Sequence, residues 1–224
     1  MANVKESRRQ RSQATREAII TAAHAVFVES GYHGATITSI ADRAGVAPQT
    51  IYFVFHTKAE LISAVIDSAV VGSDAALPPQ AQPWWQETLD EPDAARALKA
   101  FVRGAGEAFA RATSISEVLR AAALTDTEVR ATYEHHERLR REAFGEVLDG
   151  LAAKAPLRAG MSRDHLLDVF LTVYGDSSYY HLTIERGWSH DEVMDWLSDV
   201  LPTILFEAER QTRTTKTTRR KAPA

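Results

Sequence analysis

The first part of the chain alternates between apolar and polar positions with the period of a helix. From residue 12 to residue 30, apolar side chains recur at i, i+3, i+4, i+7 and i+8, which is one face of an amphipathic helix. Gly31 follows directly and is predicted to end this helix, because glycine is common just past a helix C-terminus. The apolar positions are Ile19, Ala22, Ala23, Val26 and Phe27.

Three shorter helices are predicted next. One spans residues 37–44, with Thr36 as its N-cap and Gly45 just past its end. The next begins at Pro48, since proline is tolerated at the first helical position. A further helix begins near Thr57, which is a second possible cap. The pattern therefore predicts four helices before residue 72.

Between residues 72 and 92 the periodicity disappears, and four prolines bracket Trp84 and Trp85. This segment is predicted to be a connector. Beyond it the pattern is helical again, and strand-like alternation is not convincing anywhere, so the fold class is predicted to be all-α. The expected helices cover residues 93–111, 114–123, 127–154, 162–185 and 189–211.

The composition narrows the class of protein. The 224 residues, 45% of them hydrophobic and 25% charged, fit a globular protein with one large or two small domains. The absence of cysteine excludes disulfides, thiolate metal sites and cysteine nucleophiles. Residues 1–13 lack the apolar core of a signal peptide, and no apolar stretch approaches the roughly 18 residues of a membrane span. We therefore predict a cytoplasmic protein without a membrane partner.

The charge is unevenly distributed. Residues 1–60 carry 7 basic and 5 acidic side chains, and residues 210–224 carry 6 basic and no acidic ones. Residues 61–209 carry 13 basic and 25 acidic side chains. A polyanion would be attracted to the two ends and repelled by the middle, which favours contact with nucleic acid. The Thr/Arg/Lys tail, residues 212–224, has no apolar face and is predicted to be disordered.

Two short helices joined through a glycine match the helix-turn-helix arrangement, whose second helix enters the major groove of DNA. The segment from Gly34 to Leu61, GATITSIADRAGVAPQTIYFVFHTKAEL, resembles the DNA-binding domain of the TetR family of one-component transcriptional regulators. The resemblance covers residues 11–71. It implies a three-helix helix-turn-helix DNA-binding domain over residues 1–72 and a helical bundle for ligand binding and dimerisation over residues 73–211.

The resemblance also implies DNA contacts. A helix N-terminus can bind a phosphate through its N–H groups and a hydroxyl, and the family's phosphate contacts match Thr36, Tyr52 and Lys58. Ala47 and Val54 depart from the family pattern and each removes one expected polar contact, so phosphate binding is expected to depend also on basic residues near the N-terminus, including Arg11 and Arg16. Glutamine can read adenine, and threonine or apolar groups can touch a thymine methyl. The predicted base contacts are Pro48, Gln49, Thr50 and Phe53.

The second half of the chain offers candidates for a ligand pocket and a dimer interface. Aromatic residues of the connector and of the segment from there to residue 185 could line a pocket, although core packing is the alternative for each. The last two helices have wide apolar stripes, which the family uses to build a four-helix dimer interface, and intramolecular packing is again the alternative. Pocket candidates are Trp84, Trp85, Phe101, Phe109, Tyr133, Phe144, Tyr174 and Tyr179. Interface candidates are Leu166, Phe170, Tyr174, Trp196, Leu197, Val200, Leu201 and Ile204.

These observations predict a homodimeric repressor that binds a palindromic site on double-stranded DNA. A small apolar or amphipathic effector of unknown identity would release it. The alternatives are a helical interaction or ligand-binding protein that does not bind DNA, and an enzyme. The enzyme has no support, because the sequence lacks the Gly-x-Ser-x-Gly, His-Glu-x-x-His and P-loop motifs. Catalytic residues, metal ligands and cofactors are not predicted.

Overall fold

The computed structural model describes residues 2–72 and 78–207, with side chains from residue 10 onward within those ranges. Every regular element in these ranges is helical, as predicted. No helix in the described ranges combines the length and apolar character that a membrane crossing requires. The tail predicted to be disordered, residues 212–224, lies outside the described residues, as does the predicted end of the last helix.

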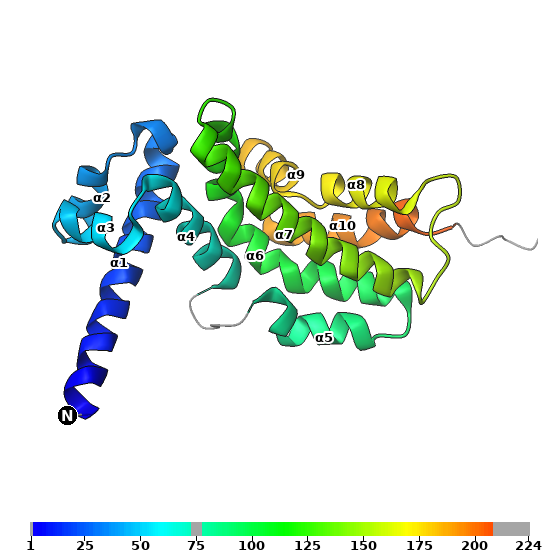
Figure 1. The fold of residues 1–224 in the computed structure, drawn as a ribbon. Coiled ribbons are helices and arrows are strands. Elements are labelled where there is room, and N and C mark those ends of the chain that lie inside the picture. Colours follow the sequence, from blue (N-terminus) through cyan, green and yellow to red (C-terminus); the bar gives the residue numbers. More distant parts are fainter. Residues whose placement is uncertain (1, 73–77, 208–224) are drawn as a thin grey trace, which may run out of the picture.

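Figure 1 shows α1–α4 grouped at one end of the molecule and the other helices packed around α6 and α7. The N-terminal part of α1 extends away from both groups. The elements are α1 (Ala2–Gly34), α2 (Ile37–Ala44), α3 (Pro48–Phe55), α4 (Lys58–Val71), η1 (Pro79–Ala81), α5 (Pro83–Asp90), α6 (Ala94–Ala123), α7 (Thr127–Ala152), α8 (Arg163–Val173), α9 (Asp176–Tyr180), η2 (His181–Glu185) and α10 (His190–Leu205).

The short helices near the N-terminus follow their local signals. Thr36 caps α2, since its Oγ1 accepts a hydrogen bond from the Ser39 N–H at 3.0 Å and Ser39 Oγ accepts one from the Thr36 N–H at 3.2 Å. Gly45 ends α2 in the left-handed conformation, with φ 67°. Pro48 is the first residue of α3. These three predictions are confirmed.

Helix α1 is longer than predicted. It begins at Ala2 and not near residue 12, because neither glycine nor proline occurs before Gly31 to interrupt it. At Gly31 the backbone leaves helical geometry, with φ 68° and ψ 170°, and the chain kinks there. Gly31 therefore breaks the regular helix where the sequence predicted an end.

The connector predicted between residues 72 and 92 is partly wrong, because this segment contains the helix α5. Pro83 occupies a permitted position in the first turn. Trp85 is buried, and the Nζ of Lys154 donates to the carbonyl oxygens of Thr88 and Leu89 at the end of the helix, at 3.0 and 2.7 Å. Lys154, which follows the end of α7, thus caps α5, and the burial of Trp85 stabilises it further. The helix is too short and too polar to be recognised from its periodicity.

Two further boundaries differ from the prediction. The helices expected over residues 93–111 and 114–123 are one continuous helix, α6, because Ala112 and Thr113 are buried against neighbouring helices. The helix expected over residues 162–185 is divided at Gly175 into α8 and α9, followed by the π-helical turn η2. A Cβ on Gly175 would collide with the carbonyl oxygen of Leu171, so the sharp turn here requires glycine.

Two apolar cores hold the molecule together. The first contains buried residues of α1–α4 and the C-terminal half of α6, including Phe27, Ile51 and Ile115. The second lies among α5, α6, α7, α8, α9 and α10 and is centred on aromatic rings such as Phe101 and Phe170. Helix α6 contributes to both cores, so it connects the N-terminal helices to the rest of the bundle.

Helix α5 approaches α6 closely at Gly104. A Cβ at this position would lie 2.5 Å from Cγ of Trp84, and because an indole ring is rigid, α5 would have to move. We expect Gly104→Ala to lower the free energy of unfolding by about 1–3 kcal/mol. The control is Gly150→Ala in α7, where the new Cβ would meet only the flexible end of Leu89 at 3.3 Å. Urea unfolding measures both, and equal effects would contradict the close approach.

Candidate functional site

Helix α3 presents one polar and aromatic face to solvent. Tyr52 is 54% exposed, Phe53 is 83% exposed, and Gln49 is exposed as well. On the opposite face, Ile51 and Phe55 are buried in the first core. The helix is therefore anchored by two apolar side chains and leaves three of its predicted contact residues accessible.

Two residues in the first turn of α3 are less accessible than Gln49, which lies between them. Pro48 and Thr50 are both half-buried, although both were predicted to contact bases. Ala47 precedes the helix and provides no side-chain cap, as its departure from the family pattern predicts. The first turn is held instead by the backbone, where the Thr50 N–H donates to the Ala47 carbonyl at 2.9 Å.

The predicted phosphate contacts are arranged around α3. Thr36 is exposed at the N-terminus of α2, although its hydroxyl already bonds to Ser39 Oγ at 3.0 Å. The guanidinium of Arg16 lies 4.5 Å from the centre of the Phe55 ring, so this part of α1 packs on α3. Arg11 is exposed one to two turns before it on α1.

Lys58 occupies a position that the sequence did not predict. Its Nζ donates to the carbonyl oxygens of Tyr32 and Ala35 at 2.8 and 3.1 Å, and it lies 4.2 Å from the centre of the Tyr32 ring. Burial lowers the pKa of Lys58, and the carboxylate of Asp126 opposes this shift. Two of its three N–H groups are therefore used inside the protein, where they join the start of α4 to the segment that follows the kink in α1.

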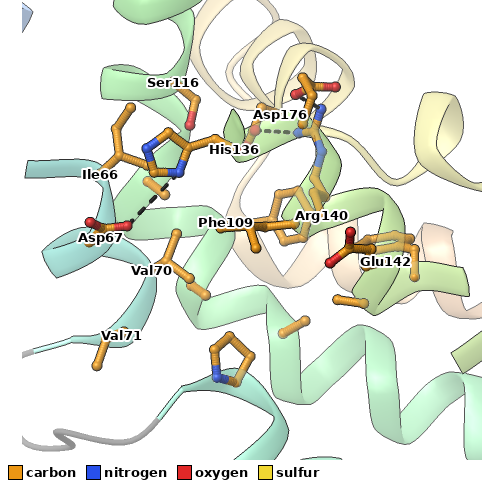
Figure 2. A pocket seen from close by; sticks show the side chains of 18 of the residues that line it. Ile66, Asp67, Val70, Val71, Phe109, Ser116, His136, Arg140, Glu142 and Asp176 are labelled. Carbon is orange, nitrogen blue, oxygen red and sulfur yellow. Dashed lines mark hydrogen bonds and ion pairs between the residues drawn. The ribbon is translucent and has the colours of Figure 1, made fainter. Parts of the chain in front are cut away.

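A cavity of about 560 Å³ lies between α4, α5, α6, α7 and α9 (Figure 2). Sites for small molecules have volumes of about 300–1,000 Å³ and mostly apolar walls. The wall formed by α4 contains Ile66, Val70 and Val71, and Phe109 of α6 also lines the cavity. Helix α4 thus belongs both to the N-terminal helices and to the wall of the cavity.

The structure brings most of the predicted pocket residues together. Tyr174 and Tyr179 do not line the cavity, and for them the prediction is wrong. Tyr174 is fully buried and its hydroxyl donates to the Val102 carbonyl at 2.7 Å, whereas the Tyr179 hydroxyl lies 2.8 Å from Nδ1 of His190 and so is directed to α10. The predicted residues that do line the cavity are Trp84, Trp85, Phe101, Phe109, Tyr133 and Phe144.

One end of the cavity is charged, which no pattern in the sequence indicated. The guanidinium of Arg140 pairs with Asp176 of α9 and with Glu137 on its own helix. Burial raises the pKa of the Asp176 carboxyl, and the Arg140 guanidinium opposes this shift. Nε of Arg140 is buried and has no hydrogen-bond partner among the described residues.

His136 joins the cavity to α4. Its Nε2 lies 3.1 Å from Oγ of Ser63, and its Nδ1 lies 3.9 Å from a carboxylate oxygen of Asp67 (Figure 2). Burial lowers the pKa of His136, and the Asp67 carboxylate opposes this shift. No sequence motif marks these residues, because α4, α7 and α9 bring them together only in the fold.

The predicted dimer interface needs correction. Five of its residues are buried in the core of a single chain, so they are unavailable to a second one. The exposed apolar side chains of this region are Ile184, Trp188 and Trp196, and the two indole rings are 6.2 Å apart. Val200 and Ile204 are partly exposed. The five buried residues are Leu166, Phe170, Tyr174, Leu197 and Leu201.

Metal ligands are not grouped in the described ranges. No cluster of three or more histidine, cysteine, aspartate or glutamate side chains there has the geometry to hold a metal ion.

Comparison with known sequences identifies the N-terminal helices. A family model described as bacterial regulatory proteins, tetR family, matches residues 19–65. The HTH-type transcriptional repressor BepR of Brucella suis is 46% identical over 55 residues, which are 25% of this chain and 26% of BepR. The HTH-type transcriptional activator FasR of Mycolicibacterium smegmatis is 44% identical over 63 residues, which are 26% of this chain and 29% of FasR. The matches thus cover between a quarter and a third of each relative.

Comparison with solved structures extends the likeness to the whole fold. NalD of Pseudomonas aeruginosa, the secondary repressor of a multidrug efflux pump, aligns with a TM-score of 0.65 and 21% identity over 88% of this chain and 98% of its own. FadR of Bacillus subtilis, in complex with stearoyl-CoA, aligns with a TM-score of 0.63 and 15% identity over 83% and 96%. At these identities the likeness concerns the fold alone. The match over residues 19–65 therefore shows that the N-terminal helices are similar to the tetR family of bacterial regulatory proteins, and the solved structures show that the fold of the rest of the chain is shared with NalD and FadR.

Proposed function

We propose that this chain is a ligand-responsive transcriptional regulator that binds double-stranded DNA as a homodimer. The observation that carries the proposal is the double role of α4, which anchors the helix-turn-helix and also forms a wall of the cavity. The relatives matched over the N-terminal helices include a repressor and an activator. Repression is the mode in which a ligand acts by releasing DNA, and it is the mode proposed here.

Recognition of DNA is assigned to α3. Gln49 can donate to and accept from adenine in the major groove, while Phe53 can contact a thymine methyl. We assign phosphate contacts to Tyr52 on α3 and to Thr36 at the N-terminus of α2, both of which are exposed. In a two-fold symmetric dimer the two α3 helices would read half-sites about 34 Å apart, so the operator would be palindromic.

The dimer is assigned to the exposed apolar surface formed by Ile184, Trp188 and Trp196. Indole rings are enriched at protein interfaces, because they bury a large apolar area and keep one polar N–H. We assign the interface to this surface in place of the five predicted interface residues that are buried in the core. It lies on η2, α10 and the turn between them.

Coupling between ligand and DNA is assigned to α4. Ile66 and Val70 face the cavity, and Arg111 of α6 donates to the carbonyl oxygens of Ala69 and Val70 at 2.9 and 3.3 Å. At its other end α4 is joined by Lys58 to the end of α1. A ligand that displaces α4 would shift the helix-turn-helix and favour a spacing of the two α3 helices that no longer fits the operator.

The first experiment is selection of bound sequences from a random pool of duplex oligonucleotides. We expect an inverted repeat, and an affinity that falls steeply between two salt concentrations because several phosphates are contacted. Gln49→Ala is expected to relax the preference at one position of each half-site and to cost about 1–3 kcal/mol there. Fluorescence anisotropy with matched and substituted duplexes measures this loss.

The control variant is Gln86→Ala, which removes an exposed amide from α5, away from the proposed DNA surface. It is expected to bind every duplex as the parent does. The assignment of α3 is wrong if Gln49→Ala retains the parent's sequence preference. A selection that recovers no sequence, with no salt-dependent binding, would instead favour an interaction protein without DNA binding.

A further inference from the structure

The wall of the cavity carries an excess of negative charge. Among the described residues that line it are six carboxylates and two guanidinium groups. Both guanidinium groups are already paired, Arg120 with Glu117 at 2.6 Å and Arg140 with Glu137 and Asp176. The remaining carboxylates are therefore not neutralised by the arginines of the cavity.

Two of these carboxylates lie on different helices around the cavity. Asp67 belongs to α4, its side chain is 63% exposed, and its nearest ion-pair partner, His136, lies 3.9 Å away, which is beyond hydrogen-bond distance. Glu142 belongs to α7 and forms no ion pair with any described residue. Figure 2 shows the two side chains at separate edges of the cavity, with Phe109 between them in this view. A charged group of opposite sign in the cavity would be attracted by both.

The surface between the carboxylates is apolar and aromatic. Rings of Trp84, Phe109, Tyr133 and Phe144 line it. The face of an aromatic ring carries partial negative charge and attracts cations, most strongly when water is excluded. Aromatic rings and carboxylates therefore favour the same ligand charge, while the rings also provide apolar contact area for a bulky body.

We propose that the cavity binds amphipathic organic monocations, with an aromatic or branched apolar body and an ammonium or phosphonium centre, and that it discriminates against organic anions. The proposal rests on the proposed function only for the consequence of binding, which is the release of DNA. This ligand class differs from stearoyl-CoA, with which FadR forms its complex, because the phosphates of such a ligand would add negative charge among uncompensated carboxylates.

The test uses two hydrophobic ions of the same shape and opposite charge, tetraphenylphosphonium and tetraphenylborate. Isothermal titration calorimetry with the full chain, without DNA, gives the affinity of each. We expect tetraphenylphosphonium to bind at least roughly tenfold more tightly, a difference of about 1.4 kcal/mol. Equal binding, tighter binding of the borate, or no binding of the phosphonium at millimolar concentration would overturn the proposal.

Variants that each remove one carboxylate charge from the cavity identify the carboxylates that attract the cation. Asp67→Asn and Glu142→Gln are each expected to weaken phosphonium binding by roughly threefold to tenfold and to leave borate binding unchanged or improved. Glu134→Gln is the matched control, since Glu134 is exposed on α7 and does not line the cavity. Thermal unfolding verifies that each variant folds. If both cavity variants bind the phosphonium as the control does, the carboxylates do not select the ligand and the proposal fails.

DNA binding is measured separately, by anisotropy of a duplex recovered from the selection. If the borate binds more tightly and releases the duplex, the ligand class proposed here is wrong and the proposed regulator remains. If the phosphonium binds as expected and the chain binds no duplex, the ligand class is supported and the proposed regulation is wrong. The two failures are therefore distinguishable.

Discussion

Replacing Phe101 with alanine is expected to lower the free energy of unfolding by about 3–5 kcal/mol, the usual cost of removing a fully buried aromatic ring. Phe101 is 1% exposed, and its ring centre lies 5.1 Å from that of Phe144 and 5.8 Å from that of Phe170. It therefore joins α6 to α7 and α8. Urea unfolding followed by circular dichroism measures the loss.

The matched control is Phe53→Ala on α3. It removes the same ring from a position that is 83% exposed, so it is expected to change the free energy of unfolding by less than about 0.5 kcal/mol. It should weaken DNA binding instead, if Phe53 contacts a base. If Phe101→Ala lowers the free energy of unfolding as little as Phe53→Ala is expected to, Phe101 is not the centre of the second core.

Replacing Lys58 with methionine is expected to lower the free energy of unfolding by about 3 kcal/mol, since two hydrogen bonds from a charged group are lost at about 1.5 kcal/mol each. The Tyr32 and Ala35 carbonyls would lose their donor, and the segment that follows the kink in α1 would no longer be joined to α4. The salt dependence of DNA binding should change little, because the amine is directed inward. Urea unfolding and anisotropy at several salt concentrations give the two quantities.

Lys99→Met is the control, because Lys99 is exposed on α6 and away from the N-terminal helices. It should alter neither quantity. The opposite result for Lys58→Met, with unchanged stability and a salt slope reduced by about one, is what a phosphate contact would produce. That outcome would restore the role implied by the family resemblance and would contradict the internal role of Lys58.

The local signals of the N-terminal helices were sufficient to predict them. Thr36, Gly45 and Pro48 each act on backbone groups within a few residues, so their effect does not depend on the rest of the chain. The contact residues Gln49, Tyr52 and Phe53 were implied by the resemblance to the TetR family and not by the apolar pattern, because residues 51–55 of α3 are all apolar or aromatic. This part of the candidate site could be predicted without a structure.

Helix α5 and the cavity could not be predicted in the same way. Helix α5 depends on a buried Trp85 and on Lys154, which is 65 residues away from Leu89 in the sequence. The charged end of the cavity joins Arg140 of α7 to Asp176 of α9, and His136 of α7 meets Asp67 of α4. Pairs at such separations leave no periodic pattern in the sequence.

The sequence by itself determined the helical class and the capped helix-turn-helix, because hydrogen bonds and apolar spacing within a few residues specify them. Only the tertiary structure decided which apolar stripes remain exposed. Leu197 and Leu201 are covered by the chain's own helices, whereas Trp196 on the same helix reaches solvent. The physical reason is that an apolar stripe shows which side chains must be buried but not which surface covers them. The covering surface depends on how helices distant in the sequence pack together.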